Sequence, residues 1–158
     1  AMAALMQMRK IILADLSKMP GKTAITVQNT VQAPVEKTWK LWTGAGHIEK
    51  WNHASDDWHT PKAVNDLRVG GKFVFTMAAK DGSFIFDFEG TYDEVTENKN
   101  IAYTMADGRK ARVTFSEEGG HTHITEVFEA EQMNPHDMQQ AGWQAILDNF
   151  KQYAEAYD

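Results

Sequence analysis

A chain of 158 residues that is 42% hydrophobic and 24% charged has the size and composition of one domain with a sizeable buried core. Its formal net charge of -6, without a basic run, argues against nucleic-acid phosphates or anionic lipid as partners, and the lack of cysteine excludes disulfides, thiolate nucleophiles and cysteine metal sites. No apolar run reaches the roughly 20 residues of a membrane span. We therefore expect a cytoplasmic protein without a membrane span.

Residues 1–22 read as an N-terminal extension. Arg9 and Lys10 follow the apolar stretch "AMAALMQM", whereas a signal peptide carries its positive charges before the apolar stretch. Ala1 ahead of Met2 is typical of an expression scar. We expect the folded domain to span residues 23–158, with no function assigned to the extension.

A strand and two short helices are predicted next. Residues 23–33, "TAITVQNTVQA", alternate apolar and polar side chains, as a half-buried strand does. Pro34 suits a first helical turn, and Trp39 and Trp42 follow on one helical face until the sequence "GAG" breaks the helix. A second short helix is expected at "HIEKWN", residues 47–52, before the polar loop "HASDDWHTP".

A run of hairpins follows. Asp-Gly at 81–82 and 107–108 and Gly-Gly at 119–120 supply the positive backbone dihedral angles of tight turns, and "TENKN" is a longer polar turn. The predicted strands of this antiparallel meander are residues 71–78, 83–95, 101–106, 110–117 and 122–131.

The C-terminal segment predicts the longest helix. Asn134 is a good N-cap and Pro135 fits the first helical position, from which the helix runs to near Asp158. The apolar stripe of this helix consists of Trp143, Ile146, Leu147, Phe150, Ala154 and Tyr157. The element order indicates an α+β helix-grip fold, in which a curved antiparallel sheet wraps around the long C-terminal helix and two short helices follow the first strand.

The first predicted hairpin carries an unusually bulky face. Because successive strand side chains point to opposite sides, its large apolar residues share one side of the sheet, where they either fill a core or line a pocket. These residues are Phe73, Phe75, Met77, Phe84, Phe86 and Phe88.

Several segments resemble a known family. "APVEKTWKLWTGAGHIEKWN" resembles the first-helix signature of the START-like, Bet v 1-like (SRPBCC) superfamily. "DLRVGGKFVFTM", "DGSFIFDFEGTYDEV" and "GWQAILDNFKQY" are similar, in the same order, to the branch named for the C-terminal domain of the activator of Hsp90 ATPase. The resemblance covers residues 23–158.

This resemblance implies a helix-grip fold with an interior cavity that takes hydrophobic or amphipathic small molecules. Trp143 would pack or close the pocket, and Trp51 and Trp58 would form a lid edge beside the polar loop. The candidate cavity residues are Trp51, Trp58, Phe73, Phe75, Met77, Phe84, Phe86, Phe88, Tyr103, Met105, Glu126 and Trp143.

Two other functions stay open. One is a chaperone-associated interaction domain, as the name of the branch suggests, although eukaryotic Hsp90 activators also carry a larger N-terminal domain. The other is an enzyme of the cyclase or hydrolase type, which would need a polar group aimed into the cavity. A protein that binds its ligand without transforming it is favoured over both.

The sequence provides no catalytic constellation and no metal site. No serine lies in a Gly-x-Ser-x-Gly elbow, and no phosphate-binding glycine loop or dinucleotide fingerprint is present. His47, His53 and His59 recur every six residues, which fits neither a helix face nor the short spacing of metal ligands. We predict no cofactor.

Glu126 is the polar residue expected inside. In "HITEVFEAE", Ile124, Glu126 and Phe128 share one strand face, and the two large apolar members mark that face as the inner one. The alternative is a bulge or a wet position at the open end of the cavity. An inward Glu126 should either bond to a partner, with Tyr103 a candidate, or have a raised pKa.

Overall fold

The computed structural model describes residues 23–157, which form a seven-stranded sheet and three helices. The strands are β1 (Ala24–Val31), β2 (Trp58–Asn65), β3 (Lys72–Ala79), β4 (Ile85–Thr96), β5 (Asn100–Met105), β6 (Lys110–Glu118) and β7 (His121–Glu129), and the helices are α2 (Val35–Thr43), α3 (Ala45–Trp51) and α4 (His136–Ala156). Every neighbouring pair of strands is antiparallel, in the order β1-β7-β6-β5-β4-β3-β2. The predicted N-terminal extension lies outside the described residues.

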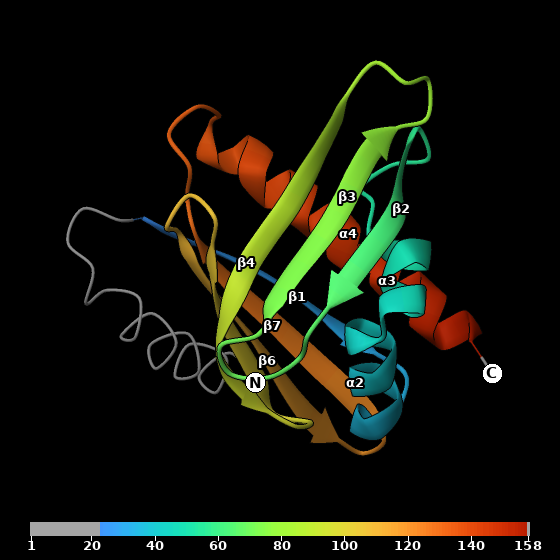
Figure 1. Ribbon diagram of the computed structural model, residues 1–158. Coiled ribbons are helices and arrows are strands. Elements are labelled where there is room, and N and C mark those ends of the chain that lie inside the picture. Colours follow the sequence, from blue (N-terminus) through green and yellow to red (C-terminus); the bar gives the residue numbers. More distant parts are fainter. Residues whose placement is uncertain (1–22, 158) are drawn as a thin grey trace.

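The sheet curls around α4, which crosses its concave side in Figure 1. The register of β4 against β5 shifts between Tyr92 and Glu94, and such a bulge bends a strand and increases its twist. The shift also changes which residues face inward, because Tyr92 is buried before it and Val95 packs against the core after it. The helix-grip fold predicted from the sequence is confirmed.

Both short helices contact α4, and α3 lies beside β2 whereas α2 lies beside β6 and β7 (Figure 1). Gly44 ends α2 and its amide N–H donates to the carbonyl oxygen of Lys40 at 3.0 Å. Gly46, which was expected to break the helix, lies inside α3. None of the helices among residues 23–157 is long and apolar enough to cross a membrane.

The prediction of a loop at residues 53–61 is wrong in part, because β2 begins at Trp58. This strand forms an edge of the sheet, and its register shifts between His59 and Lys62, around Pro61. An edge strand tolerates a proline that cannot donate to the ladder. Thr60 and Ala63 are its buried residues, so β2 shows no alternation that a sequence could reveal.

The two ends of α4 also differ from the prediction. The helix starts at His136 with Pro135 at the N-cap, and no side chain caps it. Gln139 instead ties the preceding loop to the helix, because its Oε1 accepts from the amide of Glu131 at 2.9 Å and its Nε2 donates to the carbonyl of Asn134 at 2.8 Å. At the other end, Tyr157 lies beyond the helix and is not part of its apolar stripe.

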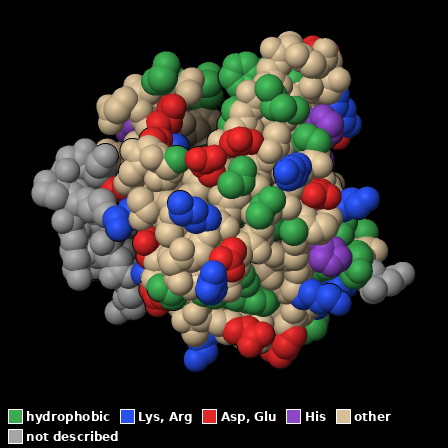
Figure 2. Space-filling view, in the orientation of Figure 1, with side chains coloured by type: hydrophobic (Ala, Val, Ile, Leu, Met, Phe, Trp, Pro, Cys, Tyr) green, Lys and Arg blue, Asp and Glu red, His purple; other side chains and the backbone are tan. Residues whose placement is uncertain are grey.

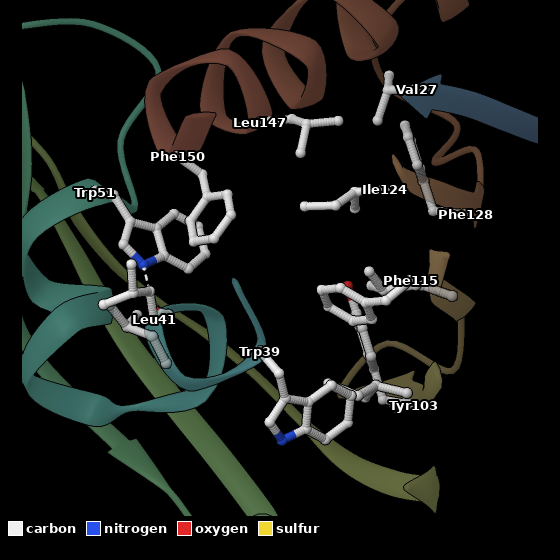
Figure 3. Packing of buried hydrophobic residues seen from close by; sticks show 14 of the residues in the cluster. Val27, Trp39, Leu41, Trp51, Tyr103, Phe115, Ile124, Phe128, Leu147 and Phe150 are labelled. Carbon is white, nitrogen blue, oxygen red and sulfur yellow. Dashed lines mark hydrogen bonds between the residues drawn. The ribbon is translucent and has the colours of Figure 1, made fainter. Parts of the chain in front are cut away.

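Phe150 connects α4 to both short helices. Its fully buried ring lies edge-on to Trp42 and to Trp51, with ring centroids 4.8 Å apart in each pair. Figure 3 shows Trp51 against Phe150, with the indole N–H of Trp51 donating to the carbonyl of Leu41 at 3.0 Å. On the other side of the core, Leu147 of α4 faces Ile124 of β7 (Figure 3). This cluster fixes α4 over the sheet.

Polar side chains of α4 bond to the free edge of β1. They lie along one side of the helix and reach the backbone groups of every second residue in β1 and just beyond it. The pairs are Gln140 Nε2 to Thr26 O (3.0 Å), Gln144 Nε2 to Gln28 O (3.0 Å), Lys151 Nζ to Thr30 O (2.6 Å) and Gln32 N to Glu155 Oε2 (2.8 Å).

Candidate functional site

A pocket of about 280 Å³ lies among α4, the two short helices and the concave face of the sheet. All three helices and strands β2 to β7 contribute to its lining. Most of the lining side chains are aliphatic or aromatic, and the polar members are Thr43, Asn52, Asn65, Tyr92, Tyr103, Arg109 and Glu126. An apolar cavity with a few polar groups is the usual form of a small-molecule site.

The aromatic face of the β3–β4 hairpin forms one wall of this pocket. Phe73 is only 2% exposed, whereas Phe86, farther along the hairpin, is 41% exposed, so the wall runs from the core towards solvent. Gly90 lies opposite Phe73, and a Cβ atom at Gly90 would come within 2.9 Å of the phenylalanine ring. The face therefore fills the core at one end and lines the pocket along most of its length.

The structure places nine of the twelve candidate residues in the lining, namely Trp51, Phe73, Phe75, Met77, Phe86, Phe88, Tyr103, Glu126 and Trp143. Trp58, Phe84 and Met105 lie outside it. Met105 is buried in the core, and Trp58 packs against Phe84 with ring centroids 6.0 Å apart. In Figure 2 hydrophobic side chains gather at the upper end of the molecule, around the tip of the β3–β4 hairpin.

The tryptophan pair expected at a lid edge is divided between two regions. Trp51 is buried and lines the pocket, while Trp58, in β2, lies outside the lining and packs against Phe84 and Phe86 of the hairpin, so the two do not form a common edge. Trp143 of α4 stacks on Phe128, with ring centroids 3.8 Å apart and planes 10° apart, and meets Phe88 edge-on at 6.0 Å. Half-buried Trp143 therefore both packs and lines the pocket.

Glu126 faces the pocket from β7 and is 7% exposed. Loss of hydration on burial raises the pKa of its carboxyl group to about 8. Tyr103, the expected partner, forms no hydrogen bond with it. A polar side chain that faces the pocket is what the enzyme hypothesis required.

The other polar residues of the lining already have partners. The hydroxyl group of Tyr92 donates to Oδ1 of Asn65, whose Nδ2 donates to the carbonyl of Thr43 at 2.7 Å. The guanidinium group of Arg109 donates to Asp107 at 2.7 Å and to the carbonyl of Glu129 at 3.1 Å.

The sequence did not point to these polar lining residues. Asn65 sits at the end of the edge strand β2, for which no strand was predicted, and Arg109 follows the turn glycine Gly108, where side-chain alternation carries no information. Tyr92 belongs to a predicted strand and shares the inward parity of Phe88, so extending the alternation by two steps would have found it.

Two histidines of the sequence motif contact α4. His47 Nδ1 lies 2.7 Å from the hydroxyl oxygen of Tyr153, and His53 Nε2 lies 3.1 Å from Nδ2 of Asn149. Burial, and then the charge of nearby Lys80, lower the pKa of His53. Within residues 23–157 no three potential metal ligands gather.

Comparisons with known proteins identify the family and the fold. The family model of the activator of Hsp90 ATPase homolog 1-like proteins matches residues 32–155. The AHSA1-like protein from Aeromonas hydrophila is 45% identical, covering 85% of this chain and 93% of that one with a TM-score of 0.80. Chr148 from Cytophaga hutchinsonii is 55% identical over 83% and 91% of the two chains, with a TM-score of 0.73.

Protein CV1439 from Chromobacterium violaceum extends the likeness to distant sequences. It is 21% identical, covers 85% of this chain and 99% of its own length, and has a TM-score of 0.76, which shows a shared fold alone. No curated protein matches the sequence.

Proposed function

The chain belongs to the family of activator of Hsp90 ATPase homolog 1-like proteins, and on this basis we propose that it binds an apolar small molecule between α4 and the sheet. The observation that carries the proposal is the pocket itself, whose wall is built from half-buried Phe75, Met77 and Phe88. Aromatic side chains left partly open to a cavity gain contacts when a ligand fills it.

The size of the pocket limits the ligand. About 280 Å³ lies just below the roughly 300–1,000 Å³ typical of small-molecule sites. A compact ligand with two aromatic rings or a short branched chain therefore suits it better than a long-chain lipid. The exposed position of Phe86 suggests that the ligand enters near the hairpin tip.

Tryptophan emission provides the test. Trp42, Trp51 and Trp143 all line the pocket, so a bound ligand should change their fluorescence. We expect one or more members of a panel of short fatty acids, flavonoids and polyketides to shift or quench the emission in a saturable way. A panel that leaves the emission unchanged up to the solubility limit of each compound would argue strongly against a ligand-binding protein.

A matched pair of variants shows whether binding occurs in this pocket. Ile146→Trp places a large side chain in the lining, whereas Met138→Trp adds the same side chain at a 60% exposed position of the same helix. Calorimetric titration should show at least about tenfold weaker binding for Ile146→Trp and unchanged binding for Met138→Trp. Equal binding by both variants would place the ligand elsewhere.

Interaction with a chaperone is a second candidate, favoured by the exposed tip of the β3–β4 hairpin. Phe84 and Ile85 are 58% and 67% exposed there, and large apolar side chains exposed together are typical of protein contacts. If this candidate holds, the protein changes the ATPase rate of Hsp90, and a Phe84→Ser, Ile85→Ser double variant loses the effect. Met133→Ser, at another exposed apolar position, is the control.

A further inference from the structure

Glu126 and Tyr103 form a polar end in an otherwise apolar part of the pocket. They are 7% and 8% exposed, and both line the pocket. Neither the Glu126 carboxyl group nor the Tyr103 hydroxyl group forms a hydrogen bond with any residue in the described range 23–157. Neither group is among the fully enclosed side-chain atoms of this range that lack a partner, so both open onto the pocket, where a polar atom of a ligand can pair with them.

The register of the sheet places these two residues on the same face, two strands apart, and the charge of Glu126 acts on the Tyr103 hydroxyl group. Glu126 of β7 lies opposite Val113 of β6, and Tyr103 of β5 lies opposite Ala111, two positions away on the same strand. All four side chains share the concave face, because residues two apart on a strand point the same way. On β6, between the two strands, Val113 lines the pocket together with Glu126 and Tyr103.

Both groups act as hydrogen-bond donors near neutral pH. Burial raises the pKa of Glu126 to about 8, so the neutral carboxyl group, with its O–H, is its main form at pH 7. Burial, and then the nearby Glu126, raise the pKa of Tyr103 well above its ordinary value, so the phenol keeps its proton. The pair can therefore present two O–H donors to one oxygen atom.

The remaining titratable groups of the lining do not compete for that oxygen. The hydroxyl group of Tyr92 is engaged by Asn65, and the guanidinium group of Arg109 is held by Asp107 and the carbonyl of Glu129. The positive charge of Arg109 also disfavours a cationic ligand in the same pocket. Accordingly, the geometry favours a neutral oxygen acceptor over an amine.

We propose that Glu126 and Tyr103 together bind the carbonyl oxygen of a ketone or aldehyde whose apolar body occupies the aromatic part of the pocket. This inference rests on the proposed small-molecule function and adds the chemical class of the ligand. The carbonyl oxygen accepts one hydrogen bond from each residue, which satisfies both buried groups at once.

Benzophenone and diphenylmethane test the inference, because they share two aromatic rings and differ at the carbonyl group. We expect the protein to bind benzophenone at least about tenfold more tightly in calorimetric titrations at pH 6.5. Tyr103→Phe, which keeps the ring, should weaken binding of benzophenone more than binding of diphenylmethane and so remove most of that preference. The carbonyl stretching band of bound benzophenone should lie at lower frequency in the wild-type protein than in Tyr103→Phe.

The pH dependence of the affinity for benzophenone tests the role of Glu126. Between pH 6.5 and pH 9 the affinity for benzophenone should fall, since the carboxyl group loses the proton that it donates. Glu126→Gln keeps an N–H donor that does not titrate, so its affinity should stay nearly constant over this range. Thermal unfolding of both variants checks that they are folded.

The outcomes separate the inference from the proposed function. Equal affinity for the two compounds would overturn the carbonyl site and leave the proposed function standing. Tighter binding of diphenylmethanamine than of benzophenone would also overturn it, in favour of an amine paired with ionised Glu126. Absence of binding by all three compounds would refute both the inference and the proposal of a pocket for two-ring apolar ligands.

Discussion

Replacing Phe150 by alanine is expected to lower the free energy of unfolding by about 4 kcal/mol, as truncation of a fully buried aromatic residue typically does. Phe150 has no exposed surface, and its ring meets the rings of Trp42 and Trp51. Its removal leaves a cavity where α4 meets both short helices. Equilibrium unfolding in urea, followed by far-UV circular dichroism, measures the loss.

Met138→Ala is the matched control for Phe150→Ala. Met138 lies on the same helix but is 60% exposed, so its truncation should change the free energy of unfolding by less than about 0.5 kcal/mol. A loss below about 1 kcal/mol for Phe150→Ala would mean that the helix does not bury this residue against α2 and α3.

Glu126 should make the folded protein less stable as the pH rises. The folded state binds the Glu126 proton with a pKa of about 8, whereas the carboxyl group of the unfolded chain titrates near 4.5. Between these values the unfolded chain has released a proton that the folded protein retains, so raising the pH favours unfolding. From pH 5 to pH 8 this effect amounts to about 3 kcal/mol. Urea unfolding at several pH values measures it.

Glu126→Gln should remove this loss and leave the variant more stable than the wild-type protein at pH 8. His47 and His53 act in the opposite direction, because their lowered pKa values make stability rise with pH, but they do so equally in both proteins. The difference between wild type and variant therefore isolates Glu126. Glu89→Gln, at an exposed position of β4, is the control. Parallel pH profiles for wild type and Glu126→Gln would contradict a buried, unpaired carboxyl group.

The fold was largely predictable because its main elements carry strong local signals. The β3–β4 hairpin combines side-chain alternation with a turn glycine, Gly82, whose φ of 80° matches the expected conformation. The edge strand β2 and the start of α4 lack such signals. β2 forms through its pairing with β3, in spite of Pro61. At the start of α4, Gln139 inside the helix bonds to the preceding loop, where a side-chain cap from Asn134 was expected.

The site was predictable in part for a related reason. Alternation correctly grouped Phe75 and Phe88, which are paired across the hairpin, and it also indicated the inward side of Glu126. It could not show where the pocket ends, so exposed Phe84 was included, although it precedes the first residue of β4. The alternation of side chains along a strand identifies the face of the sheet on which a residue lies, whereas the extent of a pocket depends on how far the covering helix reaches.

The hydrogen bonds between α4 and β1 also bear on how the protein behaves beside copies of itself. An open sheet edge is a template for a strand of another chain. Gln140, Gln144 and Lys151 occupy the backbone acceptors of β1, so intermolecular strand addition there requires α4 to detach first. At the opposite edge, Pro61 and the exposed Lys62 interrupt the ladder of β2. Neither edge is therefore an open template for another strand. The helix that covers the pocket also hinders aggregation by strand addition at β1.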